Sequence, residues 1–290
     1  MIFEPKPRLV MSQSVKDKIV NHFIANQYLL PLLEFRLVDA NTATRKHKGS
    51  SYAMRLLKKY FAELQAKHSN QKVYALKMDV SKYFYRIDHQ ILFEKLRCKI
   101  KDRDILNILK VIIDETNKPY VNESIKLYNE KYGTDIPLYE QGCGLSIGAM
   151  TSQFLAIFYL NDLDHYIKET LGCRYYIRYM DDFLILSPDK DRLKYIYKEI
   201  ERQLHTLKLT VNPKSRLYNC DSGFIFLGYR YYLDRKHHLH IKCYAKTRIK
   251  IRRRLKYLEK HDREKYRLSL ASYQGYFIGE SEHKKKRPKN

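Results

Sequence analysis

Two adjacent carboxylates, Asp181 and Asp182, interrupt a run of aromatic and β-branched residues at positions 175–186. This pattern predicts a β-hairpin with the acids at its tip. Neighbouring carboxylates repel each other unless a cation neutralises them, and oxygen ligands without Cys or His favour Mg²⁺ or Mn²⁺. A solvated β-turn would carry the same two residues, so the pair alone does not establish a metal site.

A third carboxylate, Asp79, ends a second apolar segment at residues 73–79. If the two segments are neighbouring strands of one sheet, Asp79 and Asp181 converge and can hold two metal ions about 4 Å apart, as in-line phosphoryl displacement requires. Between them, the stretch from Gly144 to Gln153 opens a predicted long apolar helix that reaches Leu163.

In this order the three segments resemble the palm of a reverse transcriptase: motif A at Asp79, motif B at 148–153 and motif C, Tyr-Met-Asp-Asp, at 179–182. The resemblance implies an RNA-directed DNA polymerase that uses template RNA and deoxynucleoside triphosphates to make cDNA. It assigns catalysis and two Mg²⁺ ions, or Mn²⁺, to Asp79, Asp181 and Asp182. Asp182 either touches metal or only positions Asp181.

The composition limits the partners and the compartment. The 290 residues include 56 Lys and Arg against 32 Asp and Glu, a formal net charge of +24. Nucleic acid is the expected partner, because phosphate neutralisation gives affinity without sequence preference. Five scattered cysteines without a CxxC pair, and no apolar stretch long enough to span a membrane, predict a cytoplasmic protein with reduced thiols and no membrane partner.

The resemblance implies an α+β right-hand polymerase fold with fingers, a palm of antiparallel sheet and helices, and a short helical thumb. We expect fingers at 1–72, palm at 73–233, thumb at 234–280 and a basic tail at 281–290. Residues 117–143 are polar and contain Pro and Gly, which predicts a surface loop inserted in the palm.

Two basic segments of the first 72 residues resemble fingers motifs, whose cations hold the triphosphate and the template. Because a triphosphate needs several convergent cations, the nucleotide-binding candidates are Arg8, Arg45, Lys46 and Lys48. A solvated charge run is the alternative for each of them.

Further candidates around the nucleotide follow from the resemblance. Phe84 stands where the family places a steric gate against a ribose 2′-hydroxyl, although aromatic residues after strands are commonly buried. Gly148 and Gln153 belong to motif B, and Ile147 directly precedes it. Lys214 follows a segment similar to motif D, whose lysine is a proposed general acid for pyrophosphate; a surface lysine is the alternative.

The C-terminal part supplies the candidates for gripping nucleic acid. Residues 224–232 resemble motif E, the hairpin that holds the primer terminus, and the primer-grip candidates are Phe226, Leu227, Gly228 and Tyr229. From residue 234 onward 19 basic residues stand against 6 acidic ones, and a helical stripe at Ile251, Leu255 and Leu258 predicts a basic thumb helix. Its nucleic-acid-binding candidates are Lys246, Arg248, Lys250, Arg252, Arg253, Arg254 and Lys256.

Motif B indicates a subfamily. Many reverse transcriptases have Gln before the glycine and Ser-Pro after it, whereas this chain has Ile147 before Gly148 and Ser152-Gln153 after it. That pattern resembles diversity-generating retroelements, whose enzymes copy a template RNA with errors at adenine and work with an accessory protein. Phage-defence, retron and group II intron enzymes are the near alternatives. A non-catalytic RNA-binding protein and an RNA-dependent RNA polymerase are more distant ones.

Overall fold

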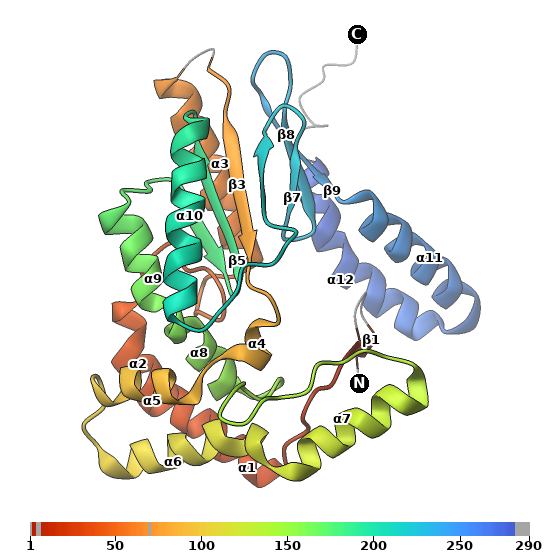
Figure 1. Cartoon of the computed structure of the whole chain (residues 1–290). Coiled ribbons are helices and arrows are strands. Elements are labelled where there is room, and N and C mark those ends of the chain that lie inside the picture. The colour runs from red at the N-terminus through yellow and green to blue at the C-terminus, as the bar shows by residue number, and fades with distance from the viewer. Residues whose placement is uncertain (1, 4–6, 69–70, 282–290) are drawn as a thin grey trace. The chain divides into compact units, whose positions relative to one another are not determined.

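The computed structural model describes residues 2–3, 7–68 and 71–281 (Figure 1). The chain divides into two compact units. Unit 1 comprises Met1–Leu57, Leu76–Ile185 and Lys190–Arg216; unit 2 comprises Lys58–Ala75, Leu186–Asp189 and Leu217–Asn290. Helix α3 (Ser50–Lys67) and strand β3 (Tyr74–Asp79) contribute residues to both units.

A four-stranded sheet has the order β4-β5-β3-β6. Its other strands are β4 (Tyr176–Tyr179), β5 (Asp182–Ser187) and β6 (Arg216–Asn219). Strands β4 and β5 pair antiparallel, which confirms the predicted hairpin, and the mixture of helices with antiparallel strands confirms an α+β fold. The four central residues of β5 are buried, as expected for a strand that is covered on both faces.

Helices make up most of unit 1. They are α1 (Val15–Ile24), α2 (Leu30–Leu33), α4 (Tyr83–Arg86), α5 (His89–Arg97), α6 (Arg103–Ile113), α7 (Pro119–Tyr132), α8 (Met150–Tyr159), α9 (Asn161–His165) and α10 (Lys190–Thr206), with single turns of π- or 3₁₀-helix at Ala25–Leu29, Glu34–Arg36, Asp114–Asn117 and Tyr166–Thr170. Figure 1 shows α10 lying along one face of the strands. Leu193, Ile196, Ile200 and Leu204 form its buried stripe, at the spacing of an amphipathic helix.

Side-chain caps begin the helices α1 and α5. The Ser14 hydroxyl accepts a hydrogen bond from the Asp17 amide at the start of α1, and the Asp88 carboxylate accepts one from the Ile91 amide at the start of α5. The start of a helix is a local property, so these bounds follow from neighbouring residues.

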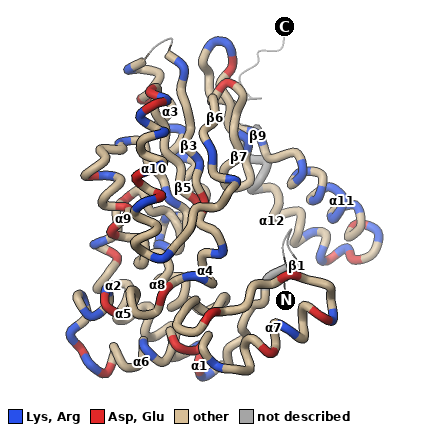
Figure 2. The backbone as a smooth tube through the Cα atoms, in the orientation of Figure 1, with Lys and Arg blue, Asp and Glu red and all other residues tan. Residues whose placement is uncertain are grey.

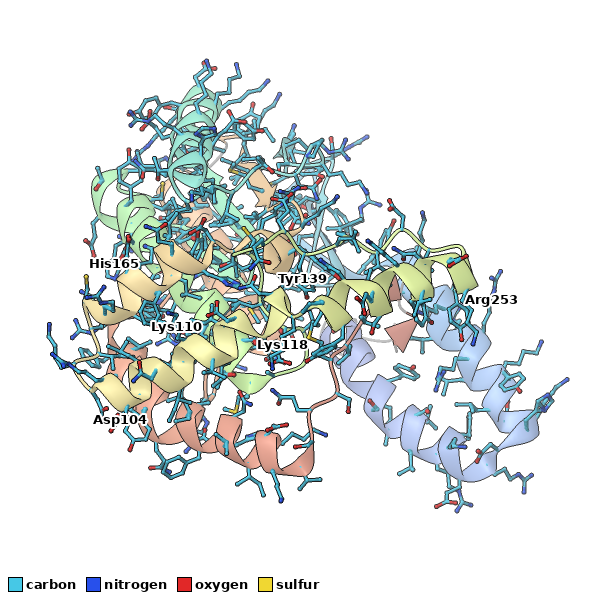
Figure 3. All side chains as sticks on the ribbon, turned by 60° about the horizontal axis from the view of Figure 1, so that its bottom comes forward. Asp104, Lys110, Lys118, Tyr139, His165 and Arg253 are labelled. Carbon is cyan, nitrogen blue, oxygen red and sulfur yellow. The ribbon has the colours of Figure 1, made fainter. Side chains whose placement is uncertain are left out.

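Residues 117–143 contain α7, so the prediction of a loop was wrong. Val121 and Ile125 are buried one helical turn apart and pack in a small cluster with Tyr139. Proline in the first turn and Gly133 in the left-handed conformation mark the ends of the helix, which Figure 3 shows beginning just after Lys118. Most residues of this segment are polar and only Val121 and Ile125 form its buried stripe, so the composition did not predict a helix.

The apolar helix after Gly148 is shorter than expected. It ends at Tyr159, because Leu160 leaves the helical conformation, and α9 then begins at Asn161 instead of continuing the same helix to Leu163. Two acids in the first turn of α9 favour a new helix start at this position.

Unit 2 holds a three-stranded antiparallel sheet in the order β7-β8-β9 and two helices. The elements are β7 (Phe224–Phe226), β8 (Tyr229–Leu233), β9 (Leu239–Cys243), α11 (Ala245–His261) and α12 (Arg263–Ser281). The rings of Phe224 and Tyr231 stack at 5.5 Å between centroids, and Phe224 also stacks on Phe61 of α3. No helix within the described residues is long and apolar enough to cross a membrane.

Candidate active site

The β4–β5 hairpin closes with a two-residue turn, Met180 and Asp181, because Tyr179 pairs with Asp182. Met180 has a φ of +56°, a left-handed conformation that costs a residue with a side chain about 1 kcal/mol or more. Such a conformation persists only where the surrounding structure holds it. The turn is therefore a fixed feature of the site.

Three carboxylates meet beside this turn. Asp79 ends β3, which neighbours β5 in the sheet, and Asp182 begins β5. Burial, together with repulsion by Asp79 and Asp182, raises the pKa of Asp181 to about 7. Burial also raises the pKa of Asp182, although Lys77 opposes that change. The repulsion marks a place where positive charge is needed.

Lys77 is a site residue that the sequence interpretation missed. Its ammonium lies 3.2 Å from the Asp182 carboxylate, and both side chains are about 30% exposed. Lys77 stands two positions before Asp79 on the same strand, so both side chains project from the same face. A lysine in an apolar strand at this spacing was the available signal.

Asp79 is held by the segment after α10. The Asn212 side chain donates a 2.7 Å hydrogen bond to the Asp79 carboxylate, and the Asp79 amide donates to the Ser215 hydroxyl at 3.0 Å. The Lys214 amide donates to the Asn212 side chain, and the Lys214 side chain is exposed. The structure thus places the motif D candidate in the same short turn that anchors Asp79.

The donor set suits a hard divalent cation such as Mg²⁺, because all three ligands would be carboxylate oxygens and a cation would relieve the repulsion on Asp181. Within the part of the chain that is described, no three Asp, Glu, His or Cys side chains are already arranged to chelate a metal. Asp182 faces Lys77 and Asp79 accepts from Asn212. Each of these contacts uses one oxygen of its carboxylate, so the other oxygen remains for a metal ion.

Phe84 lies on α4, directly after Asp79 and a left-handed Lys82. Its side chain is half-buried, whereas the neighbouring Tyr83 is fully enclosed and donates a hydrogen bond to the Ala156 carbonyl. The rings of Phe84 and Tyr83 meet edge to face at 5.8 Å between centroids, and the Phe84 ring is the more exposed of the two.

The N-terminal segment packs closely against motif B. The Met11 amide donates to the Ile147 carbonyl at 2.9 Å, and Gly148 has a φ of +119°. A Cβ atom on Gly148 would lie 2.7 Å from the Val10 side chain, so glycine is needed both for conformation and for space. Ile147 and Gln153 are half-buried.

The cations of the basic loop before α3 differ in their exposure to solvent. Arg45 donates to the Glu34 carboxylate at 2.6 Å, and Lys48 to the Asp39 carboxylate at 2.7 Å. Both side chains are largely buried by these contacts, whereas Lys46 is exposed. The side chain of Arg8 lies outside the described part of the structure.

The remaining candidates belong to unit 2. Leu227 and Gly228 have positive φ values and form the turn between β7 and β8, so the segment with the primer-grip candidates forms a hairpin. The helix α11 carries all seven nucleic-acid-binding candidates, with Ile251 and Leu258 as its buried side. The tail from residue 282 onward lies outside the described residues.

Arg178 and Asp164 are two further residues that the sequence interpretation did not select. Both are fully buried and form an ion pair at 2.5 Å, and Arg178 also donates to the carbonyl of Met180 in the turn. An arginine inside an otherwise apolar strand, three residues before Asp181, was the signal for it.

Comparison with known proteins gives a family and a set of folds. The family model described as reverse transcriptase (RNA-dependent DNA polymerase) matches residues 4–231. No curated protein matches the chain significantly.

Solved structures with a similar fold include two telomerases. Telomerase from Candida albicans, in complex with a fragment of telomeric RNA, matches 90% of this chain and 46% of its own at 13% identity and a TM-score of 0.53. A telomerase from Candida tropicalis that lacks its C-terminal domain matches 81% of this chain and 49% of its own at 15% identity and a TM-score of 0.55. The chain thus spans about half of these proteins, and the likeness shows the fold.

Proposed function

The chain belongs to the reverse transcriptase family of RNA-directed DNA polymerases, and we propose that Asp79, Asp181 and Asp182 are its catalytic carboxylates. One observation carries the proposal: three carboxylates meet beside a strained turn, where burial and mutual repulsion raise the pKa of Asp181. Divalent cations bound there would stabilise the attacking and leaving oxygens of nucleotidyl transfer.

The residues around the carboxylates take supporting roles in this proposal. Asn212 orients the Asp79 carboxylate, and Lys77 supplies a fixed positive charge beside Asp182. Lys214 gives a proton to the leaving pyrophosphate from the exposed turn next to Asn212.

The substrates are a template RNA, the growing cDNA and deoxynucleoside triphosphates. The half-buried ring of Phe84 would form the wall that excludes a ribose 2′-hydroxyl. Lys46 is the exposed cation for the triphosphate, while Arg45 and Lys48 shape its loop through Glu34 and Asp39. The exposed basic side of α11 suits phosphates of template and primer.

We further propose that the enzyme is the error-prone reverse transcriptase of a diversity-generating retroelement and acts with an accessory protein. The support is motif B, where the apolar Ile147 precedes Gly148 and Ser152-Gln153 follows. The hydroxyl of Ser152 is buried against Ser146, so Gln153 is the partly exposed polar side chain of the pair. Retron, phage-defence and group II intron enzymes are the alternatives.

Primer extension by the purified protein on an RNA template tests the proposed activity. We expect Mg²⁺-dependent incorporation of deoxynucleotides, loss of incorporation with a chelator, and loss of incorporation in Asp79→Asn while filter binding of the same RNA persists. Asn keeps the size of Asp and removes a ligand charge. Extension by Asp79→Asn at a rate close to that of the wild type would contradict the assignment.

A further inference from the structure

The guanidinium of Arg178 joins three parts of unit 1. Its Nε and Nη2 atoms donate to the Asp164 carboxylate of α9 at 2.6 and 2.5 Å. Nη2 also donates to the carbonyl of Ile157 in α8 at 2.8 Å, and Nη1 donates to the carbonyl of Met180 at 2.8 Å. One side chain thus ties the catalytic turn to two helices.

The backbone of Arg178 holds the basic loop as well. Its amide donates to the Ala40 carbonyl at 2.9 Å, and its carbonyl accepts from the amide and the hydroxyl of Thr42 at 2.9 and 3.0 Å. The hydroxyl of Thr44 lies 3.9 Å from the sulfur of Met180. The loop that carries Lys46 is therefore fixed to β4, the strand that leads into the turn with Asp181.

A role in stability alone does not explain this arrangement. Removing two charges from water costs so much that well-packed apolar residues often replace a buried ion pair without loss of stability. Arg178 and Asp164 are both 0% exposed. An apolar pair cannot supply the planar guanidinium, which holds several N–H donors at fixed angles. One of these donors, Nη1, binds the carbonyl of Met180, a residue with a left-handed backbone conformation.

We propose that Arg178, oriented by Asp164, is a positioning residue that holds the Met180–Asp181 turn in its left-handed conformation and keeps the basic loop in register with it. The hydrogen bond to the Met180 carbonyl fixes the direction in which Asp181 leaves the strand. This inference rests on the proposed polymerase activity, because its consequence is the placement of a catalytic carboxylate.

The test is the double variant Arg178→Met with Asp164→Leu, which removes both charges and leaves no unpaired buried ion. We expect the variant to fold with a lower Tm, because the buried Tyr176 hydroxyl, which donates to Asp164 at 2.6 Å, loses this acceptor. We expect kcat for primer extension to fall about 10- to 100-fold, because small displacements of catalytic groups have effects of this size. The Mg²⁺ concentration for half-maximal rate should rise several-fold.

Tyr159→Phe is the matched control, since it removes a partly buried 2.7 Å hydrogen bond to the Leu207 carbonyl and a 3.4 Å bond from the Asp88 amide, neither of which involves the turn. It should keep kcat and the Mg²⁺ dependence. If the double variant does not fold, Arg178→Lys tests the inference instead, because lysine keeps the charge but lacks the planar set of donors. This variant should show a smaller fall in kcat and a smaller rise in the required Mg²⁺ concentration. Wild-type kcat and Mg²⁺ dependence in a folded variant would overturn the inference.

A second readout separates this inference from the proposed function. Mg²⁺ should raise the Tm of the wild type and raise it less in the double variant, whether or not DNA is made. If the wild type makes no DNA while this difference remains, the proposed function fails and the positioning role stands. Equal Mg²⁺-induced shifts in both proteins would overturn the positioning role.

Discussion

The turn at Met180–Asp181 and the helix α11 hold their charges in different surroundings. At the turn, Asp181 and Asp182 are half-buried, and Arg178 behind them is completely buried and bonded to four oxygen atoms. On α11 the basic side chains Arg252, Arg253 and Arg254 are exposed, and Figure 2 shows Lys and Arg along much of the helix. Chemistry needs a few charges at fixed positions, whereas phosphate binding depends on the sum of many charges. Single changes should therefore be severe at the turn and mild on the helix.

The largest effect is expected for Asp181→Asn. Because this change removes a metal-ligand charge from the turn, primer extension should fall at least about 10³-fold while RNA binding is unchanged. Single-turnover extension and filter binding on the same preparation measure both quantities. Comparable losses in extension and in RNA binding would contradict the proposal that the turn serves catalysis and α11 serves RNA binding.

The same variant should be more stable than the wild type without metal at high pH. The pKa of Asp181 in the folded chain, about 7, lies above its ordinary value, so the folded state binds more protons between about pH 4 and pH 7. Stability of the metal-free wild type should therefore fall as pH rises through this range. We expect Asp181→Asn to raise the Tm by a few degrees at pH 8 and hardly at pH 4. A Tm difference that is independent of pH would contradict this account.

The next effect concerns Phe84, on α4, five residues after Asp79. Phe84→Ala should open space at the sugar and reduce discrimination against ribonucleotides by about 10- to 100-fold, since exclusion of a hydroxyl needs a wall. Extension rates with each nucleotide class give the ratio, and Phe84→Tyr, which keeps the ring, is the control. Unchanged ribonucleotide exclusion in Phe84→Ala would make the ring a packing residue only.

On α11 the expected effect is smaller and depends on salt. Replacing Arg252, Arg253 and Arg254 with Gln should weaken RNA binding. The binding constant should also depend less on salt: the negative slope of log K against log salt should become shallower by about 0.7 for each phosphate that is no longer neutralised. Turnover at saturating template should change far less than in Asp181→Asn. Glu259→Gln on the same helix is the control and should not weaken binding. An unchanged salt slope in the triple variant would remove α11 from the RNA surface.

The smallest effect is expected at Ile147, next to Gly148. A glutamine there can form one hydrogen bond near the nucleotide, worth about 0.5–1.5 kcal/mol, which corresponds to at most about tenfold in selectivity. Ile147→Gln should therefore lower misincorporation, most at template adenine, with little change in rate. Sequencing of cDNA made by the wild type, Ile147→Gln and Ile147→Leu on one template measures it. Equal error spectra in all three would show that Ile147 does not set fidelity.

The amino-acid sequence by itself determined the local features of this protein. A run of aromatic and branched residues around Asp181 predicted the hairpin, and the stripe through Ile251 and Leu258 predicted α11. Each signal lies within one strand or a few helical turns, where spacing along the chain sets which side chains share a face. The order of the three motifs also indicated the family.

Only the tertiary structure decided which distant residues serve the site. The contacts of Lys77 with Asp182, and of Asn212 with Asp79, join residues more than 100 positions apart. Arg178 faces Asp164 because π-helical and loop residues between them turn the chain back. Burial turns such polar pairs into fixed geometry, because an unpaired charge inside the protein costs too much to persist. That constraint arises from packing in three dimensions, which spacing along the chain does not specify.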